Sequence, residues 1–167
     1  MILKIVRAVA IVLRIGPEKI LKLEKEAITD PLTGLLNRRG LEERLKEELK
    51  RFERYKRPFL IAFIDLDDLK TVNDLYGHQR GDQVIVSLAE TIKRSCRAVD
   101  FSARVGGDEF IIVFTETTDR TIVQRLRQGN VSIGYSCYEG SKSLEETIAE
   151  AETMMRQEKK LKNGRGV

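Results

Sequence analysis

The sequence predicts a mixed fold of the α/β (α+β) class, with helices flanking a central antiparallel sheet. Residues 59–64 are six consecutive apolar residues, the length and composition of a strand buried on both faces. Two further short apolar runs surround a Gly-Gly pair, as in a hairpin. From residue 59 onward the expected order is therefore strand, helix, strand, strand, helix, strand. This order is the ferredoxin-like split βαββαβ arrangement, here preceded by an N-terminal helical extension.

Helices are predicted where apolar residues recur at helical spacing between charged ones. Residues 1–15 are almost all aliphatic, with a narrow basic face, and a second helix follows over 17–27. The apolar positions of the later helices are Leu41, Leu45, Leu49 and Phe52; Val84, Ile85, Leu88 and Ile92; and Leu144, Ile148, Ala151 and Met155. These patterns predict helices over 41–55, around 84–92 and over 144–162, and a short helix is expected over 121–126.

Strands are expected over 59–64, 101–105, 110–114 and 131–135, and residues 30–34 have the composition of a turn. In the split arrangement the first strand lies antiparallel to the third. The end of the first strand therefore meets the start of the third.

Size and composition limit the class of protein. The chain has 167 residues, with 41% hydrophobic and 34% charged, enough to form a folded core and too apolar for a disordered chain. We assign residues 1–28 to an N-terminal helical segment and 29–167 to one domain. No run reaches the 18 or so apolar residues that span a membrane, and no secretory signal is visible. Cys96 and Cys137 form no disulfide framework, so a cytoplasmic location is expected.

The N-terminal residues 1–15 leave three interpretations open. Their wide apolar face suits a dimerisation helix or peripheral contact with a membrane surface, and it equally suits a helix packed on its own domain. The net charge of +4 suits an anionic partner without identifying one.

Two carboxylates are expected to converge at one end of the sheet. Asp65 ends the first strand, and Asp108 precedes the third. Gly106 and Gly107 stand beside Asp108 and allow a backbone to approach an anion closely, while Lys70 supplies a positive charge. Carboxylates, glycines and a lysine together indicate a metal-dependent nucleotide site. The alternative is an acidic strand end beside an ordinary tight turn.

Four segments carry a family resemblance. In chain order they are Asp30–Arg38 (DPLTGLLNR), Asp65–Asp74 (DLDDLKTVND), Tyr76–Asp82 (YGHQRGD) and Arg104–Phe110 (RVGGDEF). Together they resemble the motifs of the GGDEF family, the diguanylate cyclases, over a region from Asp30 to the C-terminus. The resemblance makes residues 29–167 a GGDEF catalytic domain, similar in fold to the adenylyl cyclase catalytic domain and the polymerase palm.

The resemblance implies an activity and its partners. Family members condense two GTP into cyclic di-GMP and release two pyrophosphates. Each domain holds one GTP, so catalysis needs a homodimer. The implied cofactor is Mg²⁺, with Mn²⁺ as an alternative, and no nucleic-acid polymer is expected as a partner.

The resemblance also implies roles for individual residues. Metal ligands would be Asp65, Asp108 and the carbonyl of Leu66. Glu109 would assist the metal or deprotonate the hydroxyl, and these two roles stay open. The implied catalytic residues are Glu109, Asp108 and Lys70. Substrate binding is implied for three further sets of residues. These are Asn73 and Asp82 for guanine, Gly106 and Gly107 for close backbone approach, and Lys70, Lys159 and Arg165 for phosphates. We interpret His78 as structural.

An inhibitory site is implied by Arg97 and Asp100, nine and six residues before Gly106, which resemble the RxxD motif that binds cyclic di-GMP. This motif would give product feedback inhibition.

The sequence also departs from the family pattern. The stretch 114–131 is shorter than usual, and the Lys and Arg of the C-terminal helix are spaced more widely. Asp68 stands where the family usually has an aromatic residue or His, and Leu69 replaces the common Phe. No proposed metal ligand is lost, so an active cyclase is expected. The alternatives are a weak or inactive domain that serves as a cyclic di-GMP receptor, and a purely structural dimerisation domain.

Overall fold

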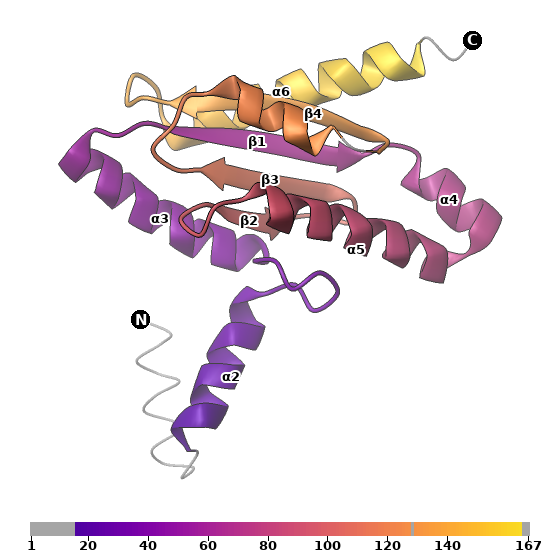
Figure 1. Cartoon of the computed structure of the whole chain (residues 1–167), viewed down its shortest axis with the longest axis horizontal. Coiled ribbons are helices and arrows are strands. Elements are labelled where there is room, and N and C mark those ends of the chain that lie inside the picture. The colour runs from indigo at the N-terminus through magenta and orange to yellow at the C-terminus, as the bar shows by residue number, and fades with distance from the viewer. Residues whose placement is uncertain (1–15, 128, 165–167) are drawn as a thin grey trace.

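The computed structural model describes residues 16–127 and 129–164. The predicted helix over 1–15, with its proposed membrane or dimer contact, and Arg165 lie outside the described residues. A four-stranded antiparallel sheet forms the centre of the domain, in the order β2-β3-β1-β4 (Figure 1). The strands are β1 (Phe59–Leu66), β2 (Phe101–Arg104), β3 (Glu109–Phe114) and β4 (Val131–Tyr138).

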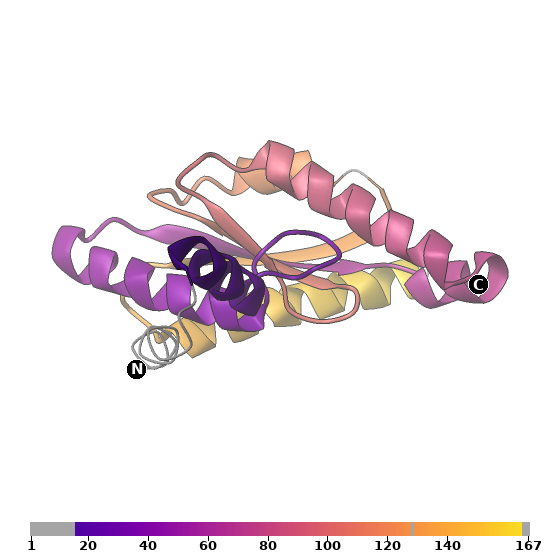
Figure 2. The ribbon, with the colours of Figure 1, turned by 90° about the horizontal axis from the view of Figure 1, so that it is seen from below.

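Helices cover both faces of this sheet. The helices of the described residues are α2 (Pro17–Ile28), α3 (Arg38–Tyr55), α4 (Leu69–Tyr76), α5 (His78–Ser95), the 3₁₀ helix η1 (Arg120–Leu126) and α6 (Leu144–Asn163). Figure 2 shows α5 and η1 on one face of the sheet and α3 and α6 on the other. Within the described ranges no helix is both long and apolar enough to cross a bilayer.

Alternation along β1 divides the core in two. Even-numbered side chains such as Leu60 and Ile64 pack with α5 and η1, whereas odd-numbered ones such as Ile61 and Phe63 pack with α3 and α6. Because all eight residues of β1 are buried, the strand is apolar throughout until Asp65. The same parity places the side chains of Asp65 and Glu109 toward α6.

The predicted strand order and the antiparallel pairing of the first and third strands are confirmed. Several elements are longer than predicted: β1 runs to Leu66, β4 runs to Tyr138, and α5 begins at His78. One differs in type, since 120–126 is a 3₁₀ helix. One helix was not predicted. α4 stands before α5 and has no buried residue. Leu69, Val72 and Leu75 are at helical spacing, but eight residues are too few for that pattern to predict a helix by itself.

Close packing of α6 on β4 fixes the position of the last helix. A Cβ atom at Gly134 would lie 1.9 Å from the carbonyl oxygen of Ala151 and 2.3 Å from the backbone nitrogen of Met155. Since both are backbone atoms, no side-chain rotation could make room for it. Glycine at 134 therefore sets the height of α6 above the sheet.

Candidate functional site

The end of β1 brings the predicted carboxylates together. Asp65 pairs with Glu109 across the β1–β3 ladder, and the backbone N–H of Leu66 donates to the carbonyl of Asp108 at 3.0 Å. The side chain of Asp65 is only 10% exposed. The convergence expected from the strand order is thus present, at the end of the sheet where β1 leads into α4.

The hairpin loop between β2 and β3 holds Gly106 and Gly107. The backbone N–H groups of Val105 and Gly106 both donate to the carbonyl of Glu109, at 2.9 and 3.4 Å. A Cβ atom at Gly106 would lie 2.5 Å from Oε2 of Glu109, whereas one at Gly107 would meet nothing within 4 Å. A side chain at position 106 would therefore displace the carboxylate of Glu109, whereas Gly107 leaves its backbone uncovered.

Arginines tie this loop to the segment before α3. Arg104 donates to the carbonyl of Gly107 at 2.8 Å and forms an ion pair with Asp30 at 3.3 Å. Arg38 donates to the carbonyl of Val105 at 2.9 Å. Both arginines belong to the motifs, but no role was predicted for either. Their links join residues about 70 positions apart, which local patterns do not reveal.

Asp30 itself is held in its charged form. Burial raises the pKa of this carboxyl, but hydrogen bonds from Thr33 and the charge of Arg104 together outweigh burial and bring the pKa below its usual value. The charged carboxylate of Asp30 therefore holds the 30–38 segment against the hairpin loop through Arg104.

Two lysines of α6 reach the same end of the sheet. The ammonium of Lys159 donates to Oδ1 of Asp65, and that of Lys162 donates to Asp67 and to the carbonyl of Val131. Lys159 was expected to bind phosphate, and it lies beside a proposed metal ligand. Lys162 and the buried Asp67, which also accepts from the hydroxyl of Ser132 at 2.6 Å, were not predicted.

The pKa values of two carboxyl groups at this site are raised. Burial raises the pKa of Asp65; the hydrogen bond from Lys159 opposes this rise and the charge of Asp108 adds to it, leaving the pKa above its usual value. Burial, then the charges of Asp108 and Asp65, likewise raise the pKa of Glu109. A cation at this position would relieve both effects.

These donors fit a hard divalent cation. Carboxylate and carbonyl oxygens are the ligands that Mg²⁺ prefers, and Asp65, Asp108 and the Leu66 carbonyl supply them. In the part of the chain described, no three or more His, Cys, Asp or Glu side chains form a cluster that could hold a metal. A cation here would therefore draw further ligands from backbone, water and substrate phosphates, which is the usual pattern for Mg²⁺.

The proposed guanine-binding residues lie on α4 and α5. Oδ1 of Asn73 is buried with no hydrogen-bond partner among the described residues. A Cβ atom at Gly81 would lie 1.9 Å from that oxygen, so Asn73 rests directly on this glycine. Asp82 is exposed and is the fifth residue of α5, and Lys70 is exposed on the first turn of α4. His78 is exposed as the first residue of α5.

Asp68, one of the departures from the family pattern, starts α4 in a left-handed conformation with φ 57°. Its carboxylate accepts from the side chain of Asn130 at 2.9 Å. The unusual carboxylate thus links α4 to the loop before β4.

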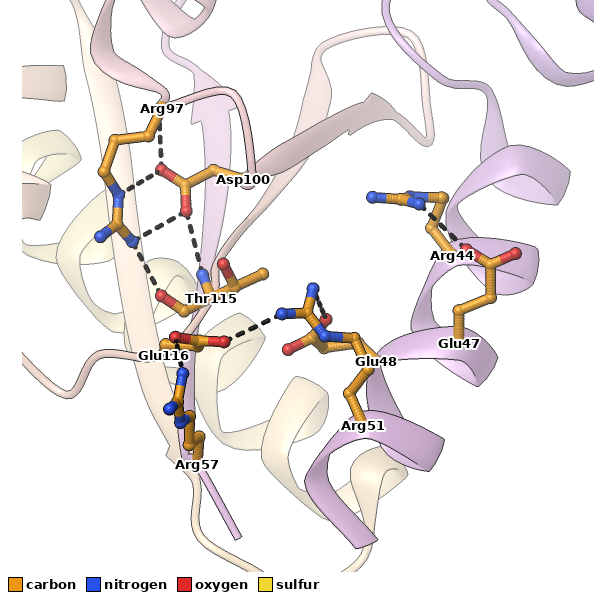
Figure 3. A network of polar contacts seen from close by, with 9 residues as sticks. All are labelled: Arg44, Glu47, Glu48, Arg51, Arg57, Arg97, Asp100, Thr115 and Glu116. Carbon is orange, nitrogen blue, oxygen red and sulfur yellow. Dashed lines mark hydrogen bonds and ion pairs between the residues drawn. The ribbon is translucent and has the colours of Figure 1, made fainter. Parts of the chain in front are cut away.

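Arg97 and Asp100 are brought together, but they are engaged with each other. Arg97 donates to both carboxylate oxygens of Asp100 and, at 2.7 Å, to the carbonyl of Thr115; the N–H of Thr115 donates back to Asp100 at 3.0 Å (Figure 3). The Asp100 side chain is 1% exposed, whereas that of Arg97 is 53% exposed. A ligand at this pair would meet Arg97 first and would have to compete for it with Asp100.

Comparison with known proteins agrees with this geometry. The family model described as diguanylate cyclase, GGDEF domain, matches residues 27–129. Diguanylate cyclase DgcP of Pseudomonas aeruginosa is 42% identical over 106 residues, which cover 62% of this chain and 16% of DgcP. Probable diguanylate cyclase DgcJ of Escherichia coli is 39% identical over 102 residues, covering 61% and 21%. The chain therefore spans about a fifth or less of the length of these relatives.

Solved structures show the same fold. The coiled coil and GGDEF domain of DgcB from Caulobacter crescentus, in complex with c-di-GMP, gives a TM-score of 0.80 at 26% identity, covering 94% of this chain and 93% of that one. Diguanylate cyclase SiaD of Pseudomonas aeruginosa, in complex with its activator SiaC, gives 0.76 at 30% identity, covering 94% and 67%. By the extent of the family match and the shared architecture, this chain belongs to the GGDEF-domain family of diguanylate cyclases.

Proposed function

We propose that this chain is an active diguanylate cyclase that joins two GTP molecules into cyclic di-GMP and releases two pyrophosphates. One observation carries the proposal: Asp65, Asp108 and Glu109 converge at the end of β1, beside the open backbone of Gly107 and the ammonium of Lys159. This combination suits a metal-bound triphosphate, where catalysis consists mainly of positioning and charge neutralisation.

In this proposal the residues divide the chemistry among them. Asp65, Asp108 and the Leu66 carbonyl hold Mg²⁺ or Mn²⁺, which when bound acts as a Lewis acid on the reacting phosphate. Glu109 takes the proton of the 3′-hydroxyl or shares the metal. The 3′-oxygen bonds to the α-phosphorus of the second GTP, the phosphoanhydride bond between its α- and β-phosphates breaks, and pyrophosphate leaves.

Binding and orientation fall to other residues. Asn73 and Asp82 bind the guanine edge, where a carboxylate can accept from the N1–H and N2–H groups that adenine lacks as a pair. Lys70, Lys159 and Arg165 neutralise the phosphates, and Lys159 exchanges Asp65 for a phosphate as the nucleotide enters. Gly106 and Gly107 let the loop backbone lie against the nucleotide.

Two domains must face each other, because each holds one GTP and both ester bonds join different nucleotides. The rate at low enzyme concentration should therefore rise faster than linearly with protein. Cyclic di-GMP bound at Arg97 and Asp100 is proposed to inhibit the enzyme, with the guanidinium of Arg97 moving from Asp100 to the ligand.

The test is direct. Purified protein at high concentration is incubated with GTP and Mg²⁺, and products are separated by chromatography with mass detection. Asp108→Ala should abolish cyclic di-GMP formation while the melting temperature stays close to that of the wild type. Glu53→Ala, which removes an exposed carboxylate on α3, is the matched control and should retain activity. Turnover by a pure Asp108→Ala preparation would refute the proposed role.

A second candidate function is a cyclic di-GMP receptor without useful catalysis. The short segment between β3 and β4 favours it, because a single 3₁₀ helix occupies this stretch. A receptor would bind cyclic di-GMP in calorimetry, lose binding in Arg97→Ala, and produce nothing from GTP even at high protein concentration. Product formation by the wild type decides against it.

A further inference from the structure

A second lysine–carboxylate pair lies beside the one at Asp65. Asp65 lies at the end of β1 and Asp67 just beyond it, while Lys159 and Lys162 are three residues apart on α6. Lys159 contacts the first carboxylate and Lys162 the second. Because α6 runs in the same direction as β1, as Figure 1 shows, the two pairs form consecutive links between helix and strand.

The carboxylate of Asp67 is engaged inside the protein. Its side chain is 4% exposed, and each of its oxygens has a protein partner. Oδ1 accepts from the hydroxyl of the buried Ser132 at 2.6 Å, and Oδ2 accepts from the ammonium of Lys162 at 2.9 Å. Asp67 is therefore built into the fold, although it stands only two residues after the proposed metal ligand Asp65.

Lys162 has further partners. It also donates to the carbonyl of Val131 and lies 3.4 Å from the carboxylate of Glu158, one turn earlier in α6. Glu158 in turn accepts two hydrogen bonds from the guanidinium of Arg127, at 2.7 and 2.8 Å. The last turns of α6 are thus attached to the end of β1, to the first residue of β4 and to the segment before β4.

Lys159 is held by fewer contacts. Within the described ranges its hydrogen-bond partner is Asp65 alone. Because Asp65 is the proposed metal ligand, nucleotide entry separates this pair and frees the ammonium of Lys159 for a phosphate. The helix then requires another attachment to keep that ammonium beside the phosphates.

A buried ion pair supplies position more than stability. The desolvation of two charges offsets much of their attraction, and an apolar pair of similar volume is often as stabilising. Apolar side chains tolerate small displacements, whereas hydrogen bonds require a narrow range of distance and angle. A shift of α6 by one turn, about 5.4 Å, would separate Lys162 from Asp67 altogether.

From these contacts we infer that Asp67, Ser132 and Lys162, here called the Asp67 cluster, are positioning residues for nucleotide binding. They hold α6 in place while Lys159 leaves Asp65 and binds the phosphates of GTP. The cluster itself does not touch the nucleotide. The inference rests on the proposed function, since it takes the GTP phosphates as the target of Lys159.

The test is calorimetric titration of the full chain, with Mg²⁺, by a GTP analogue that carries a methylene group between the α- and β-phosphates. The variant Asp67→Asn/Lys162→Met removes one negative and one positive charge together. Net charge is unchanged and neither charge is left buried without its partner, so the melting temperature should change by only a few degrees. Affinity for the analogue should fall about tenfold, because Lys159 is no longer held at the phosphates.

The matched control is Arg39→Met/Glu43→Gln. It removes an exposed ion pair of 3.2 Å from α3 and should leave affinity within about twofold. Ser132→Ala is a second, milder variant of the Asp67 cluster. It keeps both charges, removes one hydrogen bond from Asp67, and should weaken binding about threefold even if the double variant does not fold.

A thermodynamic cycle shows whether the Asp67 cluster acts through Lys159. The triple variant Asp67→Asn/Lys162→Met/Lys159→Ala should bind the analogue no more weakly than Lys159→Ala alone. Ser132→Ala should likewise have no further effect once Lys159 is alanine.

Two results would overturn the inference. Affinity within twofold of the wild type in both cluster variants would make the cluster purely structural. Fully additive losses in the cycle would mean that the cluster contacts the nucleotide directly. The proposed cyclase activity fails separately, if the wild type binds the analogue but forms no cyclic di-GMP from GTP.

Discussion

Gly81→Ala should weaken GTP binding because the added methyl group displaces the side chain of Asn73. The added Cβ would lie 1.9 Å from Oδ1 and 2.9 Å from Cγ of Asn73, well inside the 3.4 Å at which ordinary contact begins. Because Gly81 is buried within α5, the helix backbone can shift only slightly, so the side chain of Asn73 must move away. Loss of its proposed hydrogen bonds to guanine would cost about 1–3 kcal/mol, or roughly 5- to 150-fold in affinity.

Stability and binding should respond differently to this substitution. Alanine is favoured over glycine in a helix by up to about 1 kcal/mol, which offsets much of the strain at Gly81. The melting temperature should therefore change little while affinity falls. Calorimetry with a GTP analogue carrying a methylene group between the α- and β-phosphates measures binding without turnover, and Gly16→Ala adds the same methyl where nothing lies within 4 Å.

A double-mutant cycle decides whether Gly81 acts through Asn73. If it does, the double variant Gly81→Ala/Asn73→Ala binds no more weakly than Asn73→Ala alone, because the contact is already lost. Fully additive losses, or unchanged affinity in Gly81→Ala beside a weakened Asn73→Ala, would refute the reasoning.

Three further predictions concern stability. Gly134→Ala should destabilise the fold by about 1–3 kcal/mol, since the new methyl meets the backbone of Ala151, and a drop in melting temperature of several degrees checks this. Asp30, whose folded pKa lies below its ordinary 3.8, should add stability above that pH and lose it as the pH falls through the folded value. Denaturant midpoints should therefore fall less steeply below about pH 4 in Asp30→Asn; identical slopes would contradict this. Arg97→Ala should lower the free energy of unfolding by about 1–2 kcal/mol, because the buried Asp100 loses a partner while Arg97 itself is half exposed. An unchanged melting temperature would show that the pair does not contribute to stability.

Much of the fold followed from patterns that local physics enforces. The unbroken apolar run of β1 predicted a central strand, and the strand order predicted that Asp65 would meet the segment around Asp108. What escaped prediction depends on tertiary contacts or on weak patterns. α4 has only eight residues and buries none of them, so the helical spacing of its apolar residues was too short to predict a helix.

The candidate site shows the same division. The carboxylates and glycines of the site could be named from their motifs, whereas the links that hold them could not. Arg104 reaches Asp30 only once the hairpin lies against the segment before α3, and Lys162 reaches Asp67 only once α6 lies on the sheet. The motif led to a proposal that Asp100 binds a ligand, but its burial beside Arg97 and Thr115 is a property of the fold.

The division of the core by the parity of β1 has a dynamic consequence. The proposed guanine-binding residues belong to α4 and α5, on the even-numbered side, whereas Lys159 belongs to α6, on the odd-numbered side. Local opening of either layer would then disable one half of nucleotide binding and spare the other. A bound nucleotide would bridge the two layers, so amide hydrogen exchange should slow together in α4 and α6, although these helices share no core cluster.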